Sequence, residues 1–114
     1  IKDTFTSRYN ECHVLIIEEA QFFEGLYDFV LNACEKDNKH VLVVGLDGDS
    51  NRNEFGELLK LIPVCNSVRK LYGLCVRCKD GTKACFTKRL IENNDQIFIG
   101  TSEFEAVCRH HYFD

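Results

Sequence analysis

The sequence predicts an α/β fold with a parallel sheet, followed by a small metal-binding unit. Between residues 12 and 74, short apolar runs alternate with a segment of helical periodicity, the pattern of βαβ units. The stretch after Leu74 contains shorter strand-like pieces around two ligand-like pairs, Cys75 with Cys78 and Cys108 with His111. A chain of 114 residues has room for one domain, or for a core with an appendage. We therefore expect a core over residues 1–73 and a zinc-binding unit over residues 74–114.

The first half of the chain predicts a strand, a helix and a second strand. Cys12–Ile17 is a short apolar run that ends in Glu18 and Glu19, which is typical of a buried parallel strand. Leu26–Lys36 carries apolar residues at helical spacing, and His40–Leu46 is a second continuous apolar run. A right-handed crossover should join the two strands in one parallel sheet.

Shorter elements are expected beyond the second strand. Asn53–Leu61 predicts a helix ended by Pro63, and Ser67–Leu74 predicts a third strand. The later strand-like pieces are Ala84–Leu90 and Gln96–Ile99, with a loop at Glu92–Asp95 and a helical turn at Glu103–Cys108.

The Cys75, Cys78, Cys108 and His111 pattern predicts a structural zinc site. The pairs read C-x-x-C and C-x-x-H with 29 residues between them, a spacing that lets tight turns direct four ligands at one ion. The alternatives are a disulfide, a redox C-x-x-C or buried thiols. A redox pair begins a helix, whereas Lys79–Thr82 follows here as a hairpin turn signal.

The other cysteines and the composition narrow the class of protein. Cys12, Cys34, Cys65 and Cys85 stand among apolar neighbours, so we expect buried free thiols. Seven cysteines without a signal peptide favour a reduced, cytoplasmic protein. The net charge of −4 with scattered basic residues argues against nucleic acid as a partner, and the apolar runs are too short for a membrane span.

Acidic residues at the strand ends are the candidates for chemistry. Glu18 and Glu19 follow the first strand, and Leu46-Asp47-Gly48-Asp49 closes the second. Ligands collect beyond the carboxyl ends of parallel strands, and an apolar strand ending in acids is the Walker B pattern. The alternative is that these carboxylates simply face water.

The motifs taken together resemble the cellular-type (type II) thymidine kinase family. They are I-I-E-E-A-Q-F-F, V-V-G-L-D-G-D-S-N-R-N-E-F-G, L-I-P, K-L-Y-G-L-C-V-R-C, A-C-F-T-K-R and C-R-H-H-Y, in family order from about His13 onward. The resemblance implies a P-loop kinase core with a parallel sheet and a small zinc-bearing lasso domain. It also implies transfer of the ATP γ-phosphate to the 5′-hydroxyl of thymidine, giving dTMP, with Mg²⁺ accompanying ATP and a homotetramer as the assembly.

The same resemblance implies roles for individual residues. Glu19 matches the catalytic base, and Glu18 stands where the family has an aspartate associated with Mg²⁺ through water. The residues that match the nucleoside pocket are Phe22, Leu46, Phe55, Thr87 and Phe104, with Ile97, Phe98 and Gly100 in the lasso. Core packing is the alternative for the aromatic residues. Arg52 and Arg89 would either contact phosphate or be solvated.

Several departures from the family pattern leave other functions open. The sequence contains no G-x-x-x-x-G-K-[ST], the loop that holds the ATP phosphates. Ser50 and Phe104 replace the family's usual Phe and Tyr. Because the chain starts at Ile1 and has no Met, we expect the C-terminal part of a longer polypeptide, inactive by itself. The alternatives are a non-catalytic, degenerate kinase module with a structural zinc and, less favoured by the acidic balance, a zinc-ribbon nucleic-acid binder.

Overall fold

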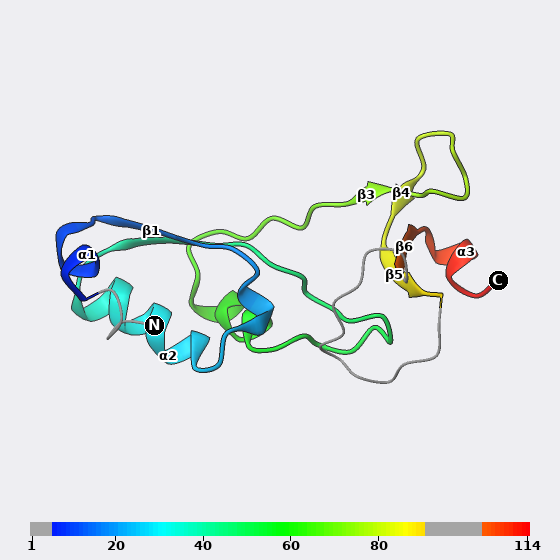
Figure 1. Ribbon diagram of the computed structural model, residues 1–114. Helices are drawn as coiled ribbons and strands as arrows, with labels where there is room; N and C mark the ends of the chain where they lie inside the picture. Colours follow the sequence, from blue (N-terminus) through cyan, green and yellow to red (C-terminus); the bar gives the residue numbers. More distant parts are fainter. Residues whose placement is uncertain (1–5, 91–103) are drawn as a thin grey trace.

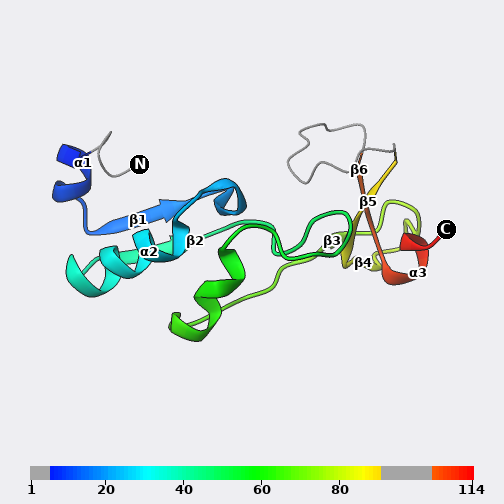
Figure 2. The same cartoon turned by 90° about the horizontal axis from the view of Figure 1, so that it is seen from below.

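The computed structural model describes residues 6–90 and 104–114, which form an elongated molecule with two centres of packing (Figure 1). Its principal extents are 48 × 27 × 22 Å, and its radius of gyration is 16.6 Å, against roughly 13 Å for a compact chain of this length. A parallel strand pair with its helix lies at one end, and the short strands and the helical turn of residues 73–90 and 104–112 lie at the other (Figure 2). No helix among the described residues has the length and apolar character needed to cross a membrane.

The expected βαβ unit is confirmed. β1 (Val14–Ile17) pairs in parallel with β2 (His40–Val43), in a register that runs from Val14 opposite His40 to Ile17 opposite Val43. The crossover is α2 (Leu26–Leu31), which continues as the π-helical turn η2 (Asn32–Lys36). The first core lies between these elements, with Ala20, Leu26, Val30 and Leu61 at its centre.

Only one face of the parallel pair is covered in the described residues. Ile17, Val41 and Val43 pack toward the core, whereas Val14, Ile16 and Leu42 are 57%, 64% and 56% exposed. Side chains alternate between the two faces of a strand, so these three share the opposite face. The expectation of strands buried on both faces is therefore met on one face alone.

A short N-terminal helix, α1 (Thr6–Glu11), was not anticipated from the sequence. Its buried Tyr9 donates a hydrogen bond of 2.5 Å to Asp37, just beyond η2, and Lys39 lies over the tyrosine ring. Burial, followed by the bond to Asp37, raises the pKa of Tyr9 to about 12. These contacts attach α1 to the turn that precedes β2.

The helix expected at Asn53–Leu61 begins later and has a different type. The observed element is the 3₁₀ helix η3 (Leu58–Val64), which contains Pro63 rather than ending before it. Gly56, at φ +64°, precedes it, and a Cβ there would lie 2.3 Å from the backbone oxygen of Gln21. This close approach and its left-handed backbone prevent a helix from running through residue 56. Proline is tolerated because its fixed φ matches a 3₁₀ backbone.

The third strand expected at Ser67–Leu74 is wrong for most of its length. Only β3 (Gly73–Leu74) forms a ladder, and it is antiparallel to β4 (Lys83–Ala84) rather than part of the parallel sheet. Val68 and Leu71 are 66% and 74% exposed. The apolar pattern indicated extended chain, but a strand also needs a neighbouring backbone to pair with, and the described residues supply one only at β3.

In the residues that the structure describes, the C-terminal unit has two small antiparallel ladders and a helical turn. β5 (Phe86–Arg89) pairs with β6 (Phe104–Val107), and α3 (Arg109–Tyr112) follows. The strand expected at Ala84–Leu90 is therefore divided at Cys85 between β4 and β5. The helical turn expected at Glu103–Cys108 is wrong over its described part, because pairing with β5 lets Val107 become fully buried in an extended strand. Glu92–Asp95 and Gln96–Ile99 lie outside the described residues.

The expectation of buried free thiols is only partly met. Cys12 and Cys85 are half-buried, but Cys34 and Cys65 are exposed. Cys34 lies in η2, where the neighbouring Ala33 takes the buried position. Cys65 follows the end of η3, and its thiol donates to the carbonyl of Ile62 in the preceding turn. Apolar neighbours in sequence do not bury a residue whose own position faces outward.

Candidate functional site

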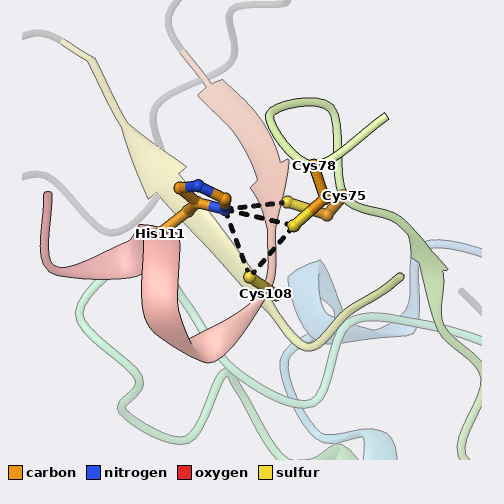
Figure 3. A group of neighbouring side chains, drawn as sticks. All are labelled: Cys75, Cys78, Cys108 and His111. Atoms are coloured by element: carbon orange, nitrogen blue, oxygen red, sulfur yellow. Dashed lines mark hydrogen bonds between the residues drawn. The ribbon is translucent and has the colours of Figure 1, made fainter. Parts of the chain in front are cut away.

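Four ligand atoms converge at the centre of the C-terminal unit, as Figure 3 shows. Cys75 follows β3, and Cys78 lies in the turn before β4. Cys108 is the N-cap of α3, and His111 lies within α3. The ligand atoms all lie within 4.8 Å of one another. The turn that follows Cys78 has Lys79 and Gly81 at positive φ, and Asp80 accepts hydrogen bonds from Thr82. The predicted hairpin turn is thus confirmed.

The distances within this Cys₃His cluster fit one tetrahedral ion. Bonds of about 2.3 Å to sulfur and about 2.0–2.1 Å to nitrogen give tetrahedral edges of about 3.8 Å between two sulfurs and about 3.5 Å between sulfur and nitrogen. The Cys78 and Cys108 sulfurs are 3.7 Å apart, and His111 Nδ1 lies 3.3 Å from each of them and 3.6 Å from Cys75. The cluster can therefore hold a metal ion.

The protonation of the cluster also suits metal binding. Burial, with hydrogen bonds to neighbouring thiols, raises the pKa of Cys78 to about 11. Burial also opposes ionisation of Cys75, but nearby backbone N–H groups and His111 outweigh it and lower its pKa to about 6. Three crowded thiols without a cation cannot all ionise at neutral pH, whereas a bound ion takes them as thiolates.

The ligands form much of the core of their own unit. Cys75, Ala84, Val107 and Cys108 are the buried members of the second cluster, with Cys78 and Tyr112 packed against them. So small an apolar cluster buries little surface. Metal binding would supply stability that packing alone cannot.

Glu19, the expected catalytic base, lies just beyond the end of β1 in an unusual conformation. Its backbone has φ 52° and ψ 41° in the left-handed region, which costs roughly 1–2 kcal/mol for a residue with a side chain. Gln21 donates from Nε2 to Glu19 Oε2 at 2.9 Å, and its Oε1 accepts from the Leu46 backbone N–H at 2.9 Å. Gln21 is only 3% exposed, and its amide links the carboxylate to the backbone of Leu46, in the segment that follows β2.

Gln21 is a functional candidate that the sequence did not single out. In the sequence, the available signal was a polar residue between the apolar residues Ala20 and Phe22. The fold buries Gln21, and a buried amide needs hydrogen-bond partners for both its N–H and its oxygen. Glu18, which directly precedes Glu19 in the chain, is exposed, as expected for a residue beyond a strand end.

Phe22, Leu46 and Phe55, which were expected to surround the substrate, are connected to the segment that contains Glu19 and Gln21. The rings of Phe22 and Phe55 meet edge to face, with centroids 5.4 Å apart. Phe55 is buried, whereas Phe22 and Leu46 are 39% and 49% exposed. Phe22 and Leu46 therefore expose apolar surface, whereas Phe55 is a core residue that packs against Phe22.

Thr87 and Phe104 lie together on the other unit. Thr87 of β5 is opposite Ala106, and Arg89 is opposite Phe104 of β6. Residues two apart share a face of a strand, so Thr87 and Phe104 are diagonal neighbours on one face. Both are half-buried. Ile97, Phe98 and Gly100 lie outside the described residues.

The two arginines left open by the sequence both lie over aromatic rings. The Arg52 guanidinium is 5.3, 4.9 and 5.1 Å from the ring centroids of Phe86, Tyr112 and Phe113. Arg89 lies 5.3 Å from the centroid of Phe104. Stacking on aromatic rings is favourable for a guanidinium, so these rings account for the position of the Arg52 side chain without a phosphate contact.

The sequence of this chain is similar to those of known proteins. The sequence model described as "Thymidine kinase" matches residues 2–112. The chain belongs to the thymidine kinase family. It is 44% identical over 110 residues to a thymidine kinase of Oryza sativa subsp. japonica. The matched region is 96% of this chain and 40% of that protein. It is 43% identical over 105 residues to thymidine kinase a of Arabidopsis thaliana, covering 91% and 43%.

A mammalian relative shows the same partial overlap. The cytosolic thymidine kinase of Homo sapiens is 38% identical over 101 residues, which is 88% of this chain and 42% of that protein. The chain thus spans about two-fifths of the length of these three relatives. Family membership confirms the resemblance seen in the motifs. The activity and the partners of the whole protein belong to the proposal that follows.

Proposed function

We propose that this chain carries the general base, the thymidine pocket and a structural zinc site of an ATP-dependent thymidine kinase. The observation that carries the proposal is the Glu19 carboxylate just past the carboxyl end of β1, linked by buried Gln21 to the backbone of Leu46, just past β2, and followed in the chain by Phe22. Ligand sites in parallel α/β folds lie at this edge. Family membership supplies the substrate class, thymidine and ATP.

In the proposed reaction, Glu19 accepts the proton of the thymidine 5′-hydroxyl as that oxygen attacks the γ-phosphorus of ATP. The bond from the γ-phosphorus to the β–γ bridging oxygen breaks, and dTMP and ADP are the products. A base must lie within hydrogen-bond reach of the hydroxyl. The bond from Gln21 restricts the carboxylate to one position and leaves its other oxygen for the substrate.

The remaining residues would bind and orient the nucleoside. Phe22, Leu46 and Phe55 would enclose the base and sugar, and Thr87 with Phe104 would border the 5-methyl group of thymine. Ile97, Phe98 and Gly100 would complete the lasso. Mg²⁺ bound with ATP would neutralise charge on the phosphates, and exposed Glu18 is the residue proposed to face it through water. The sequence has no Walker A loop, so no residue here is assigned to the triphosphate.

Zinc is the metal we propose for the Cys₃His centre. Three thiolates and one imidazole in tetrahedral positions are a preferred structural zinc donor set. With four protein ligands the site would be closed, so it would stabilise the lasso unit and take no part in phosphoryl transfer. A homotetramer is proposed from the family alone.

A phosphoryl-transfer assay tests the proposed function. The intact protein would be incubated with Mg²⁺-ATP and labelled thymidine, and dTMP would be measured by chromatography. We expect ATP-dependent dTMP formation. A folded, zinc-loaded protein that forms no dTMP would contradict the proposal and favour a non-catalytic kinase module.

A further inference from the structure

The loop between Asp47 and Phe55 is a compact hairpin held by its own hydrogen bonds. Asp49 Oδ1 accepts from the backbone N–H groups of Asn51 and Asn53, each at 2.9 Å. The Asp49 carbonyl accepts from Arg52, and Phe55 N–H donates to Asp47 at the base of the hairpin. These hydrogen bonds connect the tip of the loop to its base.

The tip of this loop is attached to the metal-binding unit. The Tyr112 hydroxyl donates a hydrogen bond of 2.5 Å to the carbonyl of Ser50, which is 62 residues away in sequence. Ser50 is 8% exposed, so this bond is largely shielded from water. The Arg52 guanidinium lies over three rings of the same unit, including that of Tyr112.

The backbone at Arg52 indicates that its side chain is the reason for its position. Arg52 has φ 64°, in the left-handed region that Gly and Asn adopt more readily. Asn residues stand on both sides of it, at 51 and 53. Asn at position 52 would adopt this left-handed backbone with less strain. The strained conformation instead falls on Arg52, the residue whose side chain contacts the aromatic rings.

The other end of the connection is the metal centre itself. Tyr112 directly follows the ligand His111, and its backbone N–H donates to the carbonyl of the ligand Cys108 at 3.0 Å. The rings of Phe86 and Tyr112 are in contact, with centroids 5.3 Å apart. The position of the Tyr112 hydroxyl thus depends on the helical turn that the metal would hold.

The base of the loop enters the proposed pocket. The Leu46 backbone N–H, just before the loop, donates to Gln21, which also holds Glu19. Phe55, at the far end, packs edge to face on Phe22. The loop therefore joins the metal-binding unit to the residues around the carboxylate.

From this chain of contacts we infer that Tyr112 and Arg52 are positioning residues, which couple metal occupancy of the Cys₃His centre to the conformation of the Asp47–Phe55 loop. The consequence for nucleoside binding rests on the proposed function, but the coupling between metal and loop does not. A merely structural contact would stabilise the protein without making loop motion depend on the metal.

Hydrogen exchange of the intact protein, measured by mass spectrometry or NMR, tests the coupling. The reporters are the bonded amides of Asn51, Arg52 and Asn53, and the β2 amides serve as an internal reference. Tyr112→Phe removes one hydroxyl, and Arg52→Lys keeps the charge but loses the planar guanidinium. Their matched controls are Tyr72→Phe and Arg69→Lys, at exposed positions outside the loop and the cluster.

We expect both test variants to exchange the reporter amides about 2- to 10-fold faster than wild type, the equilibrium effect of losing one hydrogen bond or a similar contact. Metal content and β2 exchange should not change. Removing the metal from wild type with a chelator should accelerate the same amides, and in Tyr112→Phe the chelator should add a smaller further acceleration. The two controls should match wild type.

Unchanged loop exchange in both variants, or in chelated wild type, would overturn the inference. If the intact protein forms dTMP, the variants should raise the KM for thymidine more than they change kcat. If it forms none, the proposed function fails, while the exchange measurement still decides the coupling.

Discussion

Gln21 holds Glu19 through a hydrogen bond of 2.9 Å from its amide to the carboxylate, while its own carbonyl oxygen accepts from the backbone N–H of Leu46, which follows β2. The two residues lie two positions apart, just past β1, yet their geometry depends on Leu46, in the segment that follows β2. A carboxylate restrained in this way needs little reorganisation to receive a proton. This relationship underlies the first two predictions.

Glu19→Gln should lower kcat by about 10²- to 10⁴-fold and leave the KM for thymidine nearly unchanged, because the amide keeps the shape but cannot act as a base. Glu18→Asp, which restores the usual family residue, should be neutral or mildly favourable and should act on the Mg²⁺ dependence. Steady-state kinetics of the intact protein measure both. A normal kcat in Glu19→Gln with an inactive Glu18→Asp would reverse the two roles.

Gln21→Leu should lower the free energy of unfolding by about 1–3 kcal/mol, because the part-buried Leu46 N–H loses its acceptor. Gln21→Glu keeps an acceptor for that N–H, so it should destabilise less, but its charge beside Glu19 should shift the pH dependence of kcat. Denaturant unfolding and pH–rate profiles measure the two effects. Asn66→Leu changes an exposed amide and should do neither.

Thr87 should determine the preference for the methyl group of thymine. A bulkier residue such as Ile should reduce kcat/KM for thymidine more than for deoxyuridine, by roughly 10- to 200-fold in the ratio, the range for one methyl group in an apolar pocket. Thr87 is half-buried on β5, so the larger side chain should fit without unfolding the ladder. Equal losses for the two nucleosides would place Thr87 away from the 5-position.

One zinc per chain should bind, and Cys78→Ser should remove it. Hydrogen exchange should then rise in residues 73–90 and 104–114 far more than in β1, α2 and β2, since the ligands form the core of the second cluster alone. His110 is exposed and outside the cluster, so His110→Ala should keep the zinc. Elemental analysis finding no zinc in protein prepared without chelators would contradict the assignment.

The Glu57 carboxylate should give α2 an acid-sensitive stability. It accepts from the backbone N–H groups of Tyr27 and Gly25 at the start of α2, and these bonds lower its pKa below the usual 4.5. A carboxyl with a depressed folded pKa stabilises the protein above pH 4.5, and that contribution is lost as the pH falls from there through the folded pKa. Glu57→Gln should thus have a lower Tm at pH 7.

The difference in Tm between wild type and Glu57→Gln should narrow as the pH falls below about 4.5, because Glu57 then becomes protonated and loses its charge. Thermal unfolding followed by circular dichroism from pH 3 to 7 measures this. Glu11→Gln, at an exposed position away from α2, should show no such convergence. A constant difference across the range would show that the charge of Glu57 does not cap the helix.

The sequence by itself determined the features that depend on local pattern. Continuous apolar runs around a helical period predicted the parallel pairing of Val14–Ile17 with His40–Val43, because such strands require a crossover helix. Two short ligand pairs predicted the metal cluster, since a two-residue gap within each pair already places its side chains together. Ordered motifs predicted the family, and with it the role proposed for Glu19.

Only the tertiary structure decided the features that depend on distant partners. Residues 104–107 form a strand because Phe86–Arg89 lies beside them and pairs with them. Most of Ser67–Leu74 stays unpaired because no described strand lies beside it, except next to Gly73 and Leu74. The functions inferred for Gln21 and Tyr112 arise from bonds across 25 and 62 residues. Such contacts leave no periodic signal, because hydrogen bonds and ring contacts depend on which surfaces the folded chain brings within a few ångströms.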